Sequence, residues 1–148
     1  MATIPRSSYN PQRLPCDLSN FTNDDVCKAA IEVTIENATD TQHQISKMLL
    51  RGSLNPASKR GLRECEKQYD LALYNLTSTE QYLKSDAFNK THDYNPILYV
   101  VQDAFIYVNE CASLLSKEKG VGEALKQGTE MVMKLADNDS LLIMFQVV

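Results

Sequence analysis

The stretch LRECEKQYDLALYNLTSTEQYL, residues 62–83, decides the fold of this chain. Its apolar and small residues recur at alternating steps of three and four, at Leu62, Cys65, Tyr69, Ala72, Leu76, Thr79 and Leu83. This spacing lines one face of an α-helix, and charged or polar side chains occupy most of the other positions. The stretch therefore predicts an amphipathic helix that buries one stripe against its neighbours.

Three further segments repeat this periodicity. The stripes are Cys27, Ile31, Thr34, Ala38, Thr41, Ile45 and Met48 in a helix from Cys27 to about Leu50; Ile97, Val101, Ala104, Val108, Cys111 and Leu115 in a third helix; and Ala124, Met131, Leu135, Leu142 and Phe145 in a fourth, from Glu123 to about Val147. Breaks at residues 52–56 and 117–122 and a polar loop over 85–94 separate the helices. We expect Asp24 or Asp25 to cap the first helix, and Asn95, before Pro96, to cap the third.

Four such helices joined by short breaks are typical of an antiparallel, up-and-down four-helix bundle. In the first segment, Ile31, Val33 and Ile35 also alternate with polar residues as in a half-buried strand, but we favour the helix. The length of 148 residues fits one domain. We therefore predict an all-α domain over residues 1–148, with an N-terminal extension (1–26) closed by a disulfide and a bundle over 27–148.

Composition and charge exclude several classes of protein. The chain is 43% hydrophobic and 23% charged, as in ordinary globular domains. Its net charge is -4 and it has no basic run, so we expect no nucleic-acid partner. The longest apolar runs, 97–101 and 141–145, are far too short to span a bilayer, and residues 1–15 lack the apolar core of a signal peptide. We expect no membrane partner.

Glycosylation motifs and cysteines indicate the compartment. Asn-x-Ser/Thr triplets begin at five positions, where roughly one or two are expected by chance: Asn20, Asn37, Asn75, Asn89 and Asn138. Four cysteines without a CxxC pair favour two disulfides over a zinc or redox site. We therefore expect a secreted glycoprotein whose signal peptide has been removed. The alternatives are accidental triplets and four reduced thiols in a cytosolic bundle.

Helix geometry selects among the three possible disulfide connectivities. Cys65 and Cys111 lie about equally far from the loop between the second and third helices, so they meet at one level of an antiparallel bundle. Cys27 and Cys65 open successive helices, and those ends lie about 30 Å apart, beyond disulfide reach. We predict the pairs Cys16–Cys27 and Cys65–Cys111.

The sequence shows no pattern typical of an active site. His43 and His92 have no partner at metal-ligand spacing, and there is no nucleophile elbow or glycine-rich phosphate loop. The carboxylate pairs Asp24 with Asp25 and Asp137 with Asp139 are better explained as helix caps and turns than as acid and base. We expect no enzymatic activity, no metal and no cofactor.

A bundle without catalytic chemistry can still present a binding surface. The third helix is apolar outside its stripe, at Leu98, Tyr99, Val100, Phe105, Ile106 and Tyr107, and we favour burial between two neighbouring helices over an exposed patch. The second helix presents polar residues and Tyr74 opposite its stripe, and tyrosine is enriched at interfaces. Our candidate partner-binding residues are Lys67, Asp70, Tyr74, Tyr99, Asp103 and Ile106.

Two cysteine-containing helices carry a family resemblance. The segment Leu62–Ala72, with Cys65 followed by Tyr69, Asp70 and Ala72, and the segment from Ala104 through Cys111 to Leu114 resemble the third- and fourth-cysteine helices of the plant invertase and pectin methylesterase inhibitor family. The resemblance implies a secreted or vacuolar four-helix bundle whose N-terminal extension is closed by the first disulfide. It also implies a non-enzymatic protein that binds a carbohydrate-active enzyme one-to-one and covers its active-site cleft.

The resemblance leaves a choice between two target enzymes. Pectin methylesterase inhibitors of this family lay bundle helices across the pectin groove, whereas invertase inhibitors insert a Pro-Lys-Phe element that precedes the third bundle helix. Here residues 85–88 read Ser-Asp-Ala-Phe, which weakens the invertase assignment. We expect an inhibitor of pectin methylesterase in the plant cell wall, or else in the vacuole. The alternatives are an inhibitor of acid invertase and a non-inhibitory secreted recognition module.

Overall fold

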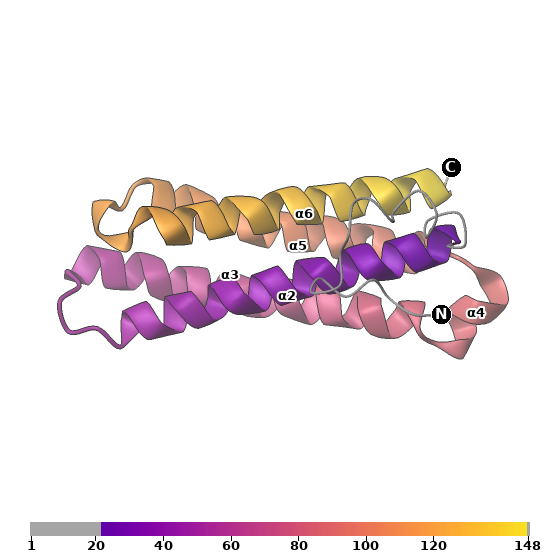
Figure 1. The fold of residues 1–148 in the computed structure, drawn as a ribbon, viewed down its shortest axis with the longest axis horizontal. Helices are drawn as coiled ribbons and strands as arrows, with labels where there is room; N and C mark the ends of the chain where they lie inside the picture. Colours follow the sequence, from indigo (N-terminus) through magenta and orange to yellow (C-terminus); the bar gives the residue numbers. More distant parts are fainter. Residues whose placement is uncertain (1–21, 148) are drawn as a thin grey trace, which may run out of the picture.

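The stripe of residues 62–83 lies inside an antiparallel four-helix bundle in the computed structural model, which describes residues 22–147 (Figure 1). The elements are α2 (Asn23–Leu49), α3 (Pro56–Leu83), α4 (Asp86–Thr91), α5 (Asn95–Ser116), the 3₁₀ turn η2 (Lys119–Val121) and α6 (Glu123–Val147). Helix α3 packs on α2 and α5, and α6 completes the ring by packing on the same two helices. The predicted all-α bundle is confirmed, and the strand alternative is wrong because Ile31, Val33 and Ile35 lie within α2.

The predicted stripes of α3 and α5 are buried at every position, and in α2 only Met48 is half-buried. The predicted stripe of α6 is wrong at three of its five positions, whereas Leu135 and Leu142 are half-buried. Ala124, Met131 and Phe145 are exposed, and the buried residues are instead Leu125, Thr129, Val132, Ala136, Asp139, Ser140 and Ile143. Three of these are polar. The predicted stripe followed the apolar residues Met131, Leu135, Leu142 and Phe145, and so missed the face that includes these polar residues.

The predicted caps of α2 and α5 also need correction. The N-cap of α2 is Thr22, whose Oγ1 accepts the backbone N–H of Asp25, while the Asp25 carboxylate accepts the N–H of Thr22, both at 3.1 Å. This reciprocal pair is a capping box, so α2 begins a turn before Cys27. Asn95 does not cap α5. It is the first residue of that helix, and its backbone and side-chain N–H groups both donate to Asp93 Oδ1.

The segment predicted as a polar loop over residues 85–94 contains the short helix α4, capped by Ser85. Phe88 of α4 is fully buried and makes edge-to-face contacts with Tyr82, His92 and Tyr94, with ring centroids 5.0–5.6 Å apart. Asp24 of α2 joins this cluster, because it accepts a hydrogen bond from Tyr94 and lies 2.5 Å from His92 Nδ1. Helix α4 therefore covers one end of the bundle as part of its core (Figure 1).

A buried tyrosine connects three helices at the centre of the bundle. Tyr69 of α3 is fully buried, and its hydroxyl lies 3.1 Å from Thr129 Oγ1 of α6. Burial raises the pKa of Tyr69 to about 12, so the hydroxyl stays protonated and can donate a hydrogen bond. Beside it, Gly128 lets α6 approach α2 closely, because a Cβ there would come within 3.2 Å of Thr41 Oγ1.

One of the two predicted disulfides lies within the described residues and is confirmed. Cys65 of α3 is bonded to Cys111 of α5, with a Cα–Cα distance of 4.7 Å. Cys27 is buried and is bonded to neither of these cysteines, and burial raises the pKa of its thiol to about 11. Its predicted partner, Cys16, lies outside the described residues. The pair Cys16–Cys27 therefore stays a prediction.

Asp139 is a carboxylic acid in the core of the bundle. It is buried on α6 and accepts a hydrogen bond from Thr34 Oγ1 of α2. Burial raises the pKa of Asp139 from 3.8 to about 8, and the hydrogen bond from Thr34 offsets only part of that effect. At mildly acidic pH the folded protein therefore carries Asp139 in its neutral form.

We expect the Cys65–Cys111 bond to account for a large share of the stability. It joins residues 46 positions apart, and closing a loop of that size restricts the unfolded chain by roughly 4 kcal/mol. The double variant Cys65→Ser/Cys111→Ser should lose about 2 to 4 kcal/mol of unfolding free energy in urea titrations. Wild type that has been reduced and thiol-blocked should lose at least as much, because reduction also opens the predicted Cys16–Cys27 bond. A variant as stable as the oxidised protein would contradict this expectation.

We expect the Asp139→Asn substitution to flatten the dependence of stability on pH. Because folding raises the pKa of Asp139, its contribution to stability is greatest below pH 3.8 and is lost as the pH rises towards 8. The loss amounts to at most about 1.4 kcal/mol per pH unit. Urea titrations at pH 4, 6 and 8 should show that the unfolding free energy of the variant increases relative to that of wild type as the pH rises. The matched control is Asp137→Asn, at an exposed position on the same helix, which should leave the wild-type slope in place.

Candidate functional site

The six candidate partner-binding residues are all exposed in the structure. Lys67, Asp70 and Tyr74 lie on α3, and Tyr99, Asp103 and Ile106 lie on α5, which packs directly against α3. We call these six residues, together with Leu71, the α3–α5 surface. Four of its members expose apolar or aromatic groups: the exposed fractions are 73% for Tyr74, 72% for Tyr99, 51% for Ile106 and 45% for Leu71.

Two cross-links fix the helices beneath this surface. The first is the Cys65–Cys111 disulfide, and the second is a hydrogen bond of 3.1 Å from Asn75 Nδ2 of α3 to the Val100 carbonyl oxygen of α5. The links are ten residues apart on α3 and eleven on α5, as antiparallel helices require. Tyr74 and Tyr99 each adjoin one partner of the second link in the sequence. The two tyrosines therefore lie at the same level of the bundle.

Two of the three charged members of the surface, Lys67 and Asp70, contact neighbouring side chains of the protein itself. The Lys67 ammonium lies 3.9 Å from the Glu64 carboxylate, one turn away on α3. Asp70 accepts a hydrogen bond from Gln42 Nε2 of α2. Both contacts are solvent-exposed and contribute little to stability. What the surface offers is a set of aromatic and aliphatic side chains with charges at its margin, an arrangement suited to contact with a protein.

Sequence reasoning missed Leu71 and gave a mixed result for α5. Leu71 adjoins the buried Ala72 in the sequence. The only feature of the sequence that could have indicated its exposure is that it is an apolar residue outside the stripe. We predicted that the apolar residues of α5 outside its stripe are buried between neighbouring helices. Four of the six are half-buried: Leu98, Val100, Phe105 and Tyr107. The other two, Tyr99 and Ile106, are more than half exposed.

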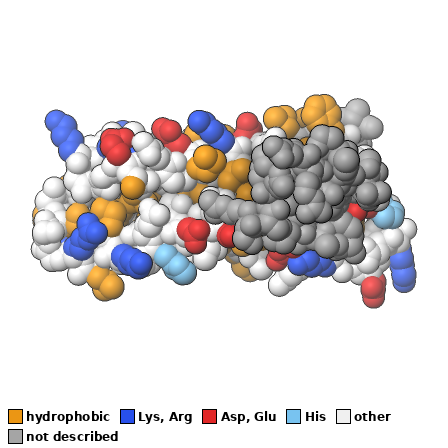
Figure 2. Space-filling view, in the orientation of Figure 1, with side chains coloured by type: hydrophobic (Ala, Val, Ile, Leu, Met, Phe, Trp, Pro, Cys, Tyr) orange, Lys and Arg blue, Asp and Glu red, His pale blue; other side chains and the backbone are white. Residues whose placement is uncertain are grey.

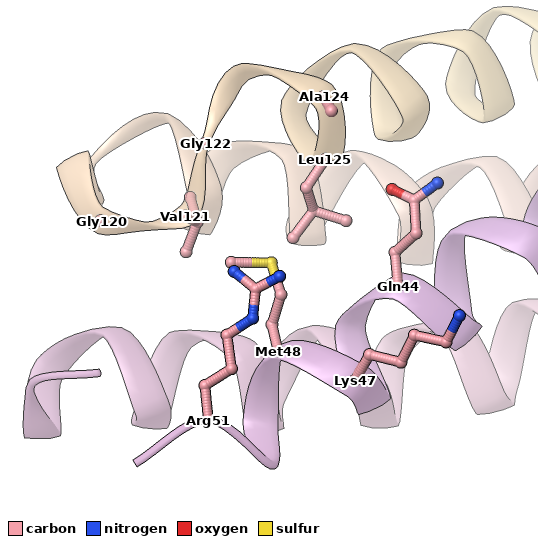
Figure 3. A pocket seen from close by; sticks show the side chains of 9 residues that line it. All are labelled: Gln44, Lys47, Met48, Arg51, Gly120, Val121, Gly122, Ala124 and Leu125. Atoms are coloured by element: carbon pink, nitrogen blue, oxygen red, sulfur yellow. The ribbon is translucent and has the colours of Figure 1, made fainter. Parts of the chain in front are cut away.

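A pocket outside the predicted site lies between the end of α2 and the start of α6 (Figure 3). Its volume is about 310 Å³, and Lys47 and Arg51 line it opposite Val121 and Leu125. All its lining residues come from α2, η2, α6 and the adjoining turns, so the pocket is separate from the α3–α5 surface. It brings together two cations and apolar side chains, and none of its lining residues is a serine, threonine, cysteine, histidine or carboxylic acid.

The described residues form no metal site and, on the face shown in Figure 2, no large region of one charge. Within residues 22–147, no three His, Cys, Asp or Glu side chains lie close enough to hold a metal ion. On the described part of the face in Figure 2, acidic and basic side chains are interspersed rather than gathered by sign. None of the described helices combines the length and the apolar character needed to cross a bilayer.

Comparison with known proteins agrees with this architecture. A family profile described as plant invertase/pectin methylesterase inhibitor matches residues 7–141. A crystal structure of a pectin methylesterase inhibitor from Arabidopsis thaliana is similar with a TM-score of 0.75 at 17% identity, covering 89% of this chain and 83% of that one. A mutant form A of an Arabidopsis pectin methylesterase inhibitor gives a TM-score of 0.74 at 17% identity, with 89% and 84% covered.

No curated protein sequence matches the chain. At 17% identity the two solved structures establish the shared fold, and the family rests on the profile. The profile spans nearly the whole chain, including both disulfide-bonded helices of the bundle. The chain therefore belongs to the plant invertase/pectin methylesterase inhibitor family.

Proposed function

We propose that this protein is a secreted inhibitor of plant pectin methylesterase that binds the enzyme one-to-one and blocks its active-site cleft with the α3–α5 surface. The observation that carries the proposal is the exposure of Tyr74, Tyr99 and Ile106 on two helices that are cross-linked beneath them. Tyrosine is enriched at protein–protein interfaces, where it often makes a large contribution to binding. The family of inhibitors to which the chain belongs supplies the kind of partner.

The cross-links suit this surface for tight binding. Association loses less entropy when the contacting groups are already held in place, because fewer side chains and backbone segments are ordered on binding. Here the disulfide and the Asn75–Val100 hydrogen bond hold α3 and α5 in one register. Tyrosine also presents a large contact area on only two rotatable side-chain bonds. The inhibitor would thus act through shape and exclusion, with no chemical step of its own.

The packing of α4 supports pectin methylesterase over invertase as the target. The resemblance to invertase inhibitors calls for an accessible Pro-Lys-Phe element before the third bundle helix. In this chain the phenylalanine at that place, Phe88, is fully buried beneath Tyr82, His92 and Tyr94. It is not available for insertion into an enzyme cleft. The two solved structures of similar fold are also described as pectin methylesterase inhibitors.

Secretion to the cell wall is part of the same proposal. The Cys65–Cys111 disulfide favours an oxidising compartment, and the five Asn-x-Ser/Thr triplets fit passage through the secretory pathway. The net charge of -4 would speed association with a basic wall enzyme at low ionic strength. The alternative target, acid invertase, would place the protein in the cell wall or in the vacuole.

The test is a titration of purified plant pectin methylesterase and of acid invertase with the oxidised protein. We expect loss of methylesterase activity with a one-to-one end point and unchanged invertase activity. Inhibition of invertase alone would refute the proposed target and identify acid invertase as the target instead. Full activity of both enzymes at micromolar excess would refute inhibition and leave a non-inhibitory recognition module.

We expect Tyr74→Ala and Tyr99→Ala each to weaken inhibition of pectin methylesterase roughly 10- to 30-fold, which corresponds to about 1.4 to 2 kcal/mol. Each substitution removes an exposed ring from the proposed interface without opening a core cavity. The matched control is Phe145→Ala, which removes a ring of similar exposure, 75%, from α6. The control should inhibit like wild type. Equal losses at all three positions would show that the α3–α5 surface is not the contact.

A further inference from the structure

The structure divides the described Asn-x-Ser/Thr triplets into two classes. In the first class the side-chain amide donates a hydrogen bond to a backbone carbonyl. Asn37 Nδ2 donates to the Val33 carbonyl at 2.8 Å, one turn back on α2, and Asn75 Nδ2 donates to the Val100 carbonyl across the α3–α5 junction. Both asparagines are half-buried.

In the second class the side-chain amide faces solvent. Asn89 on α4 and Asn138 on α6 are exposed, and neither side chain has a hydrogen bond, ion pair or ring contact with another described residue. Helix α4 lies at one end of the bundle, and α6 contributes no residue to the α3–α5 surface (Figure 1). The fifth triplet, at Asn20, lies outside the described residues.

N-linked glycosylation acts on the same atom that these hydrogen bonds use. A bond forms between Asn Nδ2 and C1 of the first sugar, and the C1–O bond to the lipid-linked diphosphate donor breaks. The amide nitrogen gives up one proton, and the lipid diphosphate leaves. At Asn89 and Asn138 the bulky glycan would project into solvent. At Asn75 the sugar would start from a nitrogen that rests against the backbone of α5.

We propose that the folded, secreted protein carries N-linked glycans at Asn89 and Asn138 and none at Asn37 and Asn75. A chain modified at Asn75 before folding keeps one N–H on Nδ2, but its first sugar has to fit where that nitrogen rests against the Val100 carbonyl of α5, which destabilises the packing of α3 on α5. Cellular quality control removes such less stable chains, so the secreted fraction is depleted of them. The proposal rests on the secretion proposed above but not on the identity of the target enzyme.

This arrangement of glycans keeps the proposed interface accessible. Asn75 directly follows Tyr74 in the sequence, so a glycan there would crowd the α3–α5 surface. Asn89 and Asn138 lie on helices that do not form that surface. Removing both glycans should therefore leave inhibition unchanged.

The test is to express the full chain through the secretory pathway of a eukaryotic host and to release the glycans enzymatically in ¹⁸O-labelled water. Released sites become ¹⁸O-labelled aspartate, and peptide mass spectrometry then gives the occupancy of each. We expect label at positions 89 and 138 and unmodified asparagine at 37 and 75. Label at position 37 or 75, or none at both 89 and 138, in folded secreted protein would overturn the proposal.

Matched variants separate glycosylation from folding. Asn89→Gln and Asn138→Gln should each remove one glycan from the secreted protein, seen as a step in gel mobility. Thr77→Ala destroys the Asn75 triplet at an exposed position while keeping the Asn75 amide and its link to Val100, so its glycan number should equal that of wild type. One glycan fewer in Thr77→Ala would contradict the proposal. Because the readout is occupancy, it is independent of whether pectin methylesterase is inhibited.

Discussion

The covalent bond between Cys65 and Cys111 is the constraint on which the arrangement of this protein depends. It fixes the level of α3 against α5, and ten residues further along α3 the Asn75–Val100 hydrogen bond repeats the same register. A helix pair fixed at two levels cannot slide, so the side chains between the links keep a constant spacing. These two links, in which the exposed tyrosines take no part, fix the distance between Tyr74 and Tyr99. Stability and the proposed binding surface thus depend on the same pair of helices.

The core that surrounds this pair contains polar groups, and they determine where α6 sits. Tyr69 lies against Thr129, and Thr34 donates to Asp139, so both contacts engage α6 at positions that a purely apolar helix would fill with leucine or valine. An unpaired polar group in a core is costly, and Thr129 and Asp139 would lose these partners if α6 were rotated. The contacts therefore favour one packing over alternatives in which α6 is turned about its axis.

How well the buried face of a helix could be predicted from the sequence depended on which residue types that face contains. In α5 every buried residue is apolar, and in α3 the predicted stripe is apolar except at Thr79, so both stripes could be read residue by residue, although the buried Ser58 and Gln68 of α3 were missed. In α6 it failed because Thr129, Asp139 and Ser140 are buried, and the partners of Thr129 and Asp139 lie on helices far away in the sequence. Helix α4 was missed because six residues are too few to show a period. The exposed residues of the candidate surface could be predicted because each lies outside the apolar stripe of its own helix. The pocket beside Lys47 could not, because it is formed by α2 together with η2 and α6, and α2 is distant in the sequence from the other two and meets them only in the folded chain.

The burial of Phe88 has a consequence for how such a protein can change its target. Where a binding loop is free of the core, its sequence can vary while the scaffold stays intact. In this bundle the connection between α3 and α5 is itself anchored in the interior by an aromatic ring, so its sequence is constrained by folding. New partners must then be acquired by single replacements on the outer turns of the helices. Divergence along that route is gradual, because each step has to preserve the packing on the reverse side of the same helix.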